Sequence, residues 1–157
     1  MDRQKVVGYV AGVFGITVVG LVIYPAFLPG REPIHRHSCI TNLKMLGTAT
    51  QIYIADFDDR MPMRGWDEEI YPYTKNRSLT SCPMIVDRGK KYGYAMNFEV
   101  MGKLAATMPV KTPLLFETDA LDPNVIANFA ARSMNRHGKG SFVCYVDGSA
   151  KFAPAPP

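Results

Sequence analysis

Residues 37–56 read His-Ser-Cys-Ile-Thr-Asn-Leu-Lys-Met-Leu-Gly-Thr-Ala-Thr-Gln-Ile-Tyr-Ile-Ala-Asp, and this stretch decides the fold of the chain. Ser38 can accept a hydrogen bond from the free backbone N–H groups at the start of a helix. After it, apolar or small residues recur every three or four positions, the spacing of one buried helix face. They are Leu43, Leu46, Gly47, Thr50, Ile54 and Phe57. The pattern predicts an amphipathic helix from about His37 to Asp56, lying on a sheet.

The composition limits the class of protein. Of the 157 residues, 47% are apolar and 20% are charged, which suits one compact domain with one further element. The net charge of +4 is spread along the chain, so we expect no nucleic acid as a partner. The three cysteines are far apart and match no zinc-ribbon or zinc-finger spacing. We therefore expect no metal site built on cysteine, and no cofactor.

Before the helix, residues 6–30 form an uncharged and largely apolar run. At a helical rise of ~1.5 Å per residue, such a run can cross the ~30 Å hydrocarbon core of a bilayer. Its length and the lack of an Ala-x-Ala site after it argue against a cleaved signal peptide. The run predicts an N-terminal transmembrane helix in residues 1–30 and a second domain in residues 31–157. Prolines 25, 29 and 33 predict that the helix ends or kinks there.

Three glycines of the apolar run, Gly8, Gly12 and Gly15, would share one helix face. In a membrane, small residues on one face let a second helix backbone approach closely. The alternative is that glycine is simply common in membrane helices. The glycine face predicts packing against other membrane proteins or copies of the same chain, within the lipid bilayer.

After the helix, residues 113–116 and 141–146 are short, apolar and β-favouring, which predicts strands of a small antiparallel sheet. Asp147-Gly148 follows the second run and is a strong signal for a two-residue hairpin. Strand residues advance ~3.3 Å each, so His137 and Asp147 should lie too far apart to share an ion. We expect Asp147 and Gly148 to make the turn, and His137 to fix the loop before the strand by hydrogen bonding.

The two-residue turn also predicts a register. Tyr145 would lie opposite Ala150 and Val143 opposite Phe152, which gives an apolar face toward the helix. Cys144 would then lie on the other face.

Catalysis has little support in the sequence. Cys144 with His137 is the only pair of nucleophile and base to consider. A cysteine in mid-strand without a third, orienting group is a poor candidate. Phosphate-binding glycine loops, Gly-x-Ser-x-Gly elbows and His-Glu-x-x-His motifs are absent from the sequence. We therefore expect that the protein is not an enzyme.

Several motifs in order resemble prepilin-type proteins. Residues 39–47, Cys-Ile-Thr-Asn-Leu-Lys-Met-Leu-Gly, are similar to the family's Cys-x-x-Asn-Leu-Lys-x-Leu-Gly helix. His137, nine further residues and Asp147-Gly148 are similar to its C-terminal His-x9-Asp-Gly motif. Between the two lie further matching positions: Trp66, Tyr71-Pro72-Tyr73, Cys82-Pro83, Tyr92-Gly93-Tyr94 and Asn97. The N-terminus departs from the family because it lacks the Gly-Phe-Thr-Leu-x-Glu processing site.

The resemblance implies a pilin-like α+β fold: a transmembrane helix, then an amphipathic helix packed on a small antiparallel sheet. It implies a non-catalytic pseudopilin-like subunit of a type II secretion, type IV pilus or related membrane assembly. Its place would be the bacterial inner membrane, single-pass, with the C-terminal domain on the periplasmic side. One alternative is an accessory single-span subunit of a larger membrane complex with a recruited pilin-like domain. Another is an anchored module that binds a ligand in the loops between Trp66 and Tyr94.

The resemblance also bears on individual residues. Cysteines at the positions of Cys39 and Cys82 commonly pair in this family, which implies a disulfide; two separate buried thiols are the alternative. A disulfide would place the domain outside the cytoplasm. Asp119 and Asp122 are weak candidates for a loop calcium site like that of some pseudopilins.

Overall fold

The computed structural model describes residues 3–24, 31–86 and 91–156, and the chain divides into two compact units, residues 1–31 and 32–157. The first unit holds helix α1 (Arg3–Ile23). The rest of the described chain is α+β, as predicted. Its helices are α2 (Arg31–Asp56), α3 (Trp66–Thr74) and α4 (Pro83–Val86), with the 3-10 helices η2 (Arg77–Thr80), η3 (Ala105–Thr107) and η4 (Phe129–Ala131). Its strands are β1 (Tyr94–Asn97), β2 (Pro113–Glu117), β3 (Ile126–Ala127), β4 (Gly140–Tyr145) and β5 (Ala150–Pro154).

Helix α1 corrects the prediction for the N-terminus. Over the described parts of the chain, no helix combines the length and the apolar character that a bilayer crossing requires. The predicted transmembrane helix and single-pass inner-membrane location are therefore wrong. The prediction placed the helix within the uncharged run of residues 6–30 and expected it to end or kink at the prolines; α1 begins at Arg3 and ends at Ile23. The end or kink predicted at prolines 25 and 29 lies outside the described residues.

Helix α2 has the predicted C-terminal end but begins at Arg31 rather than near His37. Pro33 lies in its first turn, where the missing N–H is not needed, so this proline does not break the helix. Ser38 consequently lies inside the helix and does not cap it. The predicted stripe is buried except for Phe57, which is 50% exposed because it follows the last helical residue.

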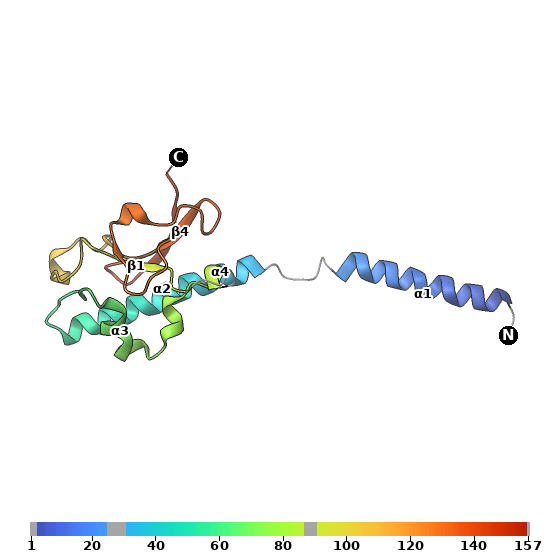
Figure 1. The fold of residues 1–157 in the computed structure, drawn as a ribbon, viewed down its shortest axis with the longest axis horizontal. Coiled ribbons are helices and arrows are strands. Elements are labelled where there is room, and N and C mark those ends of the chain that lie inside the picture. The colour runs from blue at the N-terminus through green and yellow to red at the C-terminus, as the bar shows by residue number, and fades with distance from the viewer. Residues whose placement is uncertain (1–2, 25–30, 87–90, 157) are drawn as a thin grey trace. The chain divides into compact units, whose positions relative to one another are not determined.

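The sheet has five strands in the order β3-β1-β2-β4-β5. All neighbouring strands are antiparallel except β1 and β3, which are parallel. Figure 1 shows α2 along one face of this sheet and α3 on the other side of α2. Tyr53 of α2 donates a hydrogen bond to Glu69 of α3 (2.9 Å), and Trp66 and Ile70 of α3 complete the core on that side. The apolar stripe of α2 is thereby buried between the sheet and α3, while Met45 and Ile52 on its remaining side are exposed.

The opposite face of the sheet has a small apolar core of its own. Ala95, Phe116 and Val143 are fully buried there. Phe129 of η4 covers them, with its ring edge-to-face against Phe116 at 5.5 Å between centroids. Both faces of the central strands are thus buried, which explains the nearly unbroken apolar run of β2.

The predicted hairpin register is wrong by one residue. Cys144 pairs with Ala150, and Val143 pairs with Lys151. The Tyr145 N–H donates to the Ser149 carbonyl, so three residues form the loop, with Gly148 at φ +75°. Because side chains alternate along a strand, this shift moves the β4 side chains to the other face, whereas Ala150 of β5 lies in the core beside α2 as predicted. Cys144 therefore packs in the core beside α2, and Val143 lies on the far face.

Gly148 is expected to tolerate substitution poorly. A residue with a Cβ costs about 1–2 kcal/mol in the left-handed region, so Gly148→Ala should lower the free energy of unfolding by about that amount. Gly148→Asn should cost less, because asparagine visits this region more readily. Urea denaturation of the two variants checks the order. Equal losses for Ala and Asn would show that backbone strain at this position is not the cause.

Candidate functional site

The predicted disulfide is present and joins two distant elements. Cys39 on α2 bonds to Cys82, which directly precedes α4; their Cα atoms lie 5.3 Å apart and both residues are 0% exposed. One turn further along α2, the Asn42 side chain donates to the Ser81 carbonyl (3.1 Å) and supports the same junction. The alternative of two separate buried thiols is wrong.

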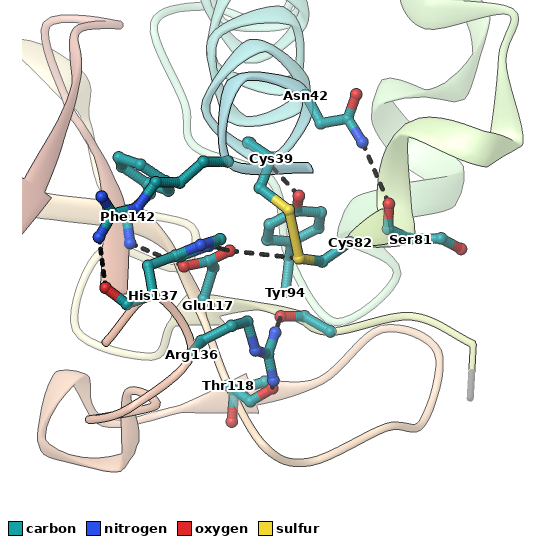
Figure 2. A network of polar contacts seen from close by, with 12 residues as sticks. Cys39, Asn42, Ser81, Cys82, Tyr94, Glu117, Thr118, Arg136, His137 and Phe142 are labelled. Carbon is teal, nitrogen blue, oxygen red and sulfur yellow. Dashed lines mark hydrogen bonds and ion pairs between the residues drawn. A yellow bond between two sulfur atoms is a disulfide. The ribbon is translucent and has the colours of Figure 1, made fainter. Parts of the chain in front are cut away.

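A carboxylate lies beside the disulfide. Glu117 ends β2 and is 0% exposed. Its Oε1 lies 2.8 Å from His137 Nε2, and its Oε2 accepts the Phe142 backbone N–H at 2.7 Å. Figure 2 shows Glu117 between His137 and Cys82, whose Sγ is 3.4 Å from Oε1. Because removing a carboxylate from water is costly without partners, these contacts are what permit a glutamate in the core.

The disulfide and the buried pair form one cluster. One ligand atom from each of Cys39, Cys82, Glu117 and His137 lies within 4.8 Å of all the others, and all four residues are buried. They come from α2, the segment before α4, the end of β2 and the loop before β4. We call these four residues the Cys-Glu-His cluster. The disulfide ties α2 to the segment before α4, and the contact of Glu117 with His137 ties the end of β2 to the loop before β4.

Arg136, the neighbour of His137, is also buried, with a side chain 3% exposed. Its guanidinium donates to the carbonyls of Gly93 (2.8 Å) and Thr118 and to the carboxylate of Asp119 (3.0 Å). Gly93 has φ +137°, and a Cβ there would lie 2.9 Å from Arg136 Nη1. The close approach of guanidinium to backbone therefore requires glycine at position 93.

Two further side chains form hydrogen bonds with backbone carbonyls of residues in the cluster. Arg36 of α2 donates to the His137 carbonyl at 2.5 Å. The Tyr94 hydroxyl donates to the Cys39 carbonyl at 3.3 Å. Burial, and then the charge of Glu117, raise the pKa of Tyr94 well above its usual value, so this hydroxyl keeps its proton. His137 and Cys39 are thus positioned by contacts that do not involve the sulfur–sulfur bond.

The remaining predicted site residues lie elsewhere. Asp147 makes the turn with Gly148: its Oδ1 accepts the Ser149 N–H (2.9 Å) and hydroxyl, and its Oδ2 pairs with Lys111. Hydrogen bonds from Lys111 and then from Ser149 hold the pKa of Asp147 well below its usual range.

The weak calcium candidates are not brought together into a metal-binding group within the described chain. Asp119 pairs with Arg136, and the acidic residue of the Cys-Glu-His cluster is Glu117 rather than Asp119 or Asp122.

The predicted glycine face lies on α1. An added Cβ at Gly8 or Gly15 would meet nothing within 4 Å. Gly12 is also part of α1, and its surroundings lie outside the described residues. The space beside Gly8 and Gly15 is open to another helix.

Sequence reasoning missed Glu117 and Arg136. Glu117 directly follows the apolar run of residues 113–116, where a charged residue normally marks the exposed end of a strand. Arg136 precedes His137 in a loop rich in polar residues. The sequence places both residues next to a predicted strand or motif, but such a position does not show whether a side chain is buried.

Cys144 is not the activated nucleophile that catalysis with His137 would need. It is buried in mid-strand, and burial, with a smaller effect of Asp147, raises the pKa of its thiol to about 12. The Nε2 of His137 is already engaged by Glu117. Thiolate is the reactive form, so Cys144 should be inert at neutral pH.

Alkylation under non-reducing conditions tests this directly. The folded chain should take up no iodoacetamide at pH 8, because the Cys144 thiol stays neutral and buried and the other two cysteines are bonded. In denaturant without reductant, intact mass should show one adduct per chain. Three adducts in denaturant would contradict the disulfide, and one adduct on the folded chain would contradict the burial of Cys144.

No protein-family model matches the chain, and no curated protein or solved structure matches it either. The resemblance to prepilin-type proteins therefore stays a prediction based on the order of the motifs. What the chain does has to be inferred from the chemistry of its own residues.

Proposed function

We propose that the chain is a non-catalytic structural subunit that associates with copies of itself through α1 and presents the pilin-like domain of residues 32–157. The exposed apolar surface of α1 carries this proposal. Every large apolar side chain described between residues 13 and 24 is exposed: Val13, Phe14, Ile16, Val18, Val19, Leu21, Val22, Ile23 and Tyr24. Leaving such side chains in water costs roughly 25 cal/mol per Å² of apolar surface.

The distribution of these side chains favours several partners over one. An amphipathic helix has one apolar stripe and needs one neighbour, whereas a helix that is apolar on all sides has to be surrounded. From Val13 to Ile23, Thr17 alone carries a polar group besides the backbone, and its hydroxyl is bonded back to the Val13 carbonyl (2.6 Å). Copies of the same chain each supply one such helix, so a bundle of α1 helices covers them all.

Glycine positions suit the same arrangement. Gly8 and Gly15 are seven residues apart, two helical turns, and therefore lie on one face. Because neither has a side chain, a neighbouring helix can approach its backbone closely.

The burial of the Cys-Glu-His cluster and of Cys144 supports a non-catalytic role. The Cys-Glu-His cluster is fully buried, and Cys144 carries a neutral thiol. Surface cavities of about 290, 330 and 150 Å³ are lined by other residues of the domain. Substrate would have no described route to the sulfurs, the glutamate or the histidine.

Self-association can be tested by cross-linking the full oxidised chain. Phe14 and Leu21 lie on one face of α1, and Phe14→Glu with Leu21→Glu places two charges in the proposed bundle. Wild type should give a ladder of cross-linked species, and the double variant mainly monomer. Phe98→Glu is the matched control: Phe98 is 52% exposed on the domain surface and Phe14 is 69% exposed on α1. A ladder that survives in the α1 variant, or that Phe98→Glu abolishes equally, would refute the proposal.

Ligand binding is the second candidate function. The cavity of about 290 Å³ lies among the predicted ligand loops, and its lining includes Asp67, Tyr71 and Tyr92. Asp67 is 8% exposed, and its Oδ1 has no hydrogen-bond partner among the described residues. A small molecule with a hydrogen-bond donor would satisfy this oxygen. A thermal-shift screen with amines and sugars tests the idea, because any stabilisation should vanish in Asp67→Ala.

A further inference from the structure

The Cys-Glu-His cluster contains the donor atoms of a zinc site. Two cysteine sulfurs, one imidazole nitrogen and one carboxylate oxygen are the ligand types that tetrahedral zinc takes in proteins. With bond lengths of about 2.3 Å to sulfur and about 2.0–2.2 Å to nitrogen and oxygen, tetrahedral ligand atoms lie roughly 3.3–3.8 Å apart. The observed separations are 2.8 Å between His137 Nε2 and Glu117 Oε1, and 3.4 Å between Glu117 Oε1 and Cys82 Sγ. Small shifts of the four side chains would bring their ligand atoms to tetrahedral separations.

We infer that reduction of the Cys39–Cys82 disulfide turns this cluster into a binding site for one Zn²⁺. A dithiol reductant supplies two electrons and two protons, and the disulfide becomes two thiols while the dithiol becomes a cyclic disulfide. On metal binding, each thiol releases its proton to solvent and binds as thiolate. His137 binds through Nε2 and Glu117 through Oε1, so the proton between these two atoms leaves Nε2 and the neutral ring has its N–H at Nδ1. The hydrogen bond between the two side chains is exchanged for two bonds to the metal.

The ligands remain close together when the sulfur–sulfur bond is cut, because other contacts hold their backbones. Tyr94 bonds the Cys39 carbonyl, and Arg36 bonds the His137 carbonyl. The junction of Asn42 with Ser81 holds the residue next to Cys82. Figure 2 shows the contacts of Tyr94 with Cys39 and of Asn42 with Ser81 beside the cluster. A site whose ligands are already positioned costs little ordering entropy when the metal enters.

Glu117 has a second contact of the kind that orients a metal ligand, whereas His137 Nδ1 has no hydrogen-bond partner among the described residues. Two thiolates and a carboxylate with Zn²⁺ leave one net negative charge in the core. Arg136 directly precedes His137, and its buried guanidinium carries a positive charge that is paired with the Asp119 carboxylate at 3.0 Å. Glu117 Oε2 keeps the Phe142 N–H, which orients the carboxylate while Oε1 binds. The metal would join α2 to the segment before α4, as the disulfide does, and would add the end of β2 and the loop before β4.

Cobalt(II) provides a spectroscopic test. The full chain is reduced with a dithiol, freed of reductant without oxygen, and titrated with Co²⁺. One cobalt per chain should bind, with the intense visible bands of tetrahedral cobalt and a thiolate-to-cobalt charge-transfer band in the near ultraviolet. Zn²⁺ should bleach both, and the oxidised chain should give neither. A weak octahedral spectrum of the reduced wild type would overturn the inference, whatever the variants do.

Variants assign the ligands. Cys144→Ser is the control, because Cys144 lies outside the cluster, and it should bind cobalt as wild type does. Cys82→Ser should lose the tetrahedral bands, and Glu117→Gln should weaken binding about tenfold or more with all three thiols retained. Circular dichroism of each reduced variant shows that it is folded. Undiminished binding by Glu117→Gln, or loss of the bands in Cys144→Ser, would contradict the assignment.

Discussion

Replacing His137 by alanine is expected to lower the free energy of unfolding of the oxidised chain by about 3–5 kcal/mol, the loss typical of leaving a buried carboxyl group without its partner. The substitution leaves the Glu117 carboxylate in the core with the Phe142 N–H as its remaining hydrogen-bond donor. It also removes an imidazole ring that packs on Phe142 at 4.6 Å between centroids. Both effects act in the folded state.

Denaturation in guanidinium chloride measures this loss of stability. Two further variants serve as controls. Lys111→Ala removes a partner from the exposed pair with Asp147 and should change stability little, because such pairs contribute little at the surface. Replacing Glu117 and His137 together by leucine should recover part of the loss, because no unpaired charge then remains in the core. A His137→Ala variant no less stable than Lys111→Ala would show that the buried pair does not hold the domain together.

Replacing Cys39 and Cys82 together by alanine is expected to cost about 2–4 kcal/mol. The bond links residues separated by 43 positions, and it therefore removes many conformations from the unfolded chain. Both cysteines are replaced because a single substitution would leave a thiol beside Glu117 and add a second effect. Without the bond, the unfolded state should be more expanded. The free energy of unfolding should therefore fall more steeply with denaturant concentration.

The reduced wild type is the natural comparison for this double variant. In the presence of a chelator, which removes any bound metal, reduced wild type should be close in stability to Cys39→Ala with Cys82→Ala. Cys144→Ala keeps the disulfide and should keep the oxidised unfolding behaviour with its smaller denaturant dependence. Oxidised and reduced wild type that unfold at the same denaturant concentration would rule out a stabilising role for the bond.

Helix α2 and the α+β class of the domain could be predicted from local sequence patterns, whereas the register between β4 and β5 could not. The three-and-four spacing from Leu43 to Ile54 is a property of the helix itself, so it identified the buried face of α2. The hairpin register depends on whether the turn holds two residues or three, and Asp147-Gly148 is compatible with both. The one-residue difference in turn length places Cys144, rather than Val143, on the sheet face toward α2.

The candidate site was predictable in part. The pairing of Cys39 with Cys82 came from a resemblance and not from spacing, and the structure confirms it. Glu117 was missed because its partners come from β4 and the loop before it, twenty or more residues away in sequence. The N-terminal prediction rested on the uncharged run of residues 6–30, and it is wrong because no described helix is long and apolar enough to cross a bilayer.

Sedimentation equilibrium of the full oxidised chain over a range of micromolar concentrations is the most direct test of the proposed assembly. If α1 is an association element, the mass should be a multiple of the 17.4 kDa monomer and should fall to one monomer in Phe14→Glu with Leu21→Glu. A wild-type chain that sediments as a single 17.4 kDa species throughout that range, with α1 helical by circular dichroism, would contradict self-association through α1.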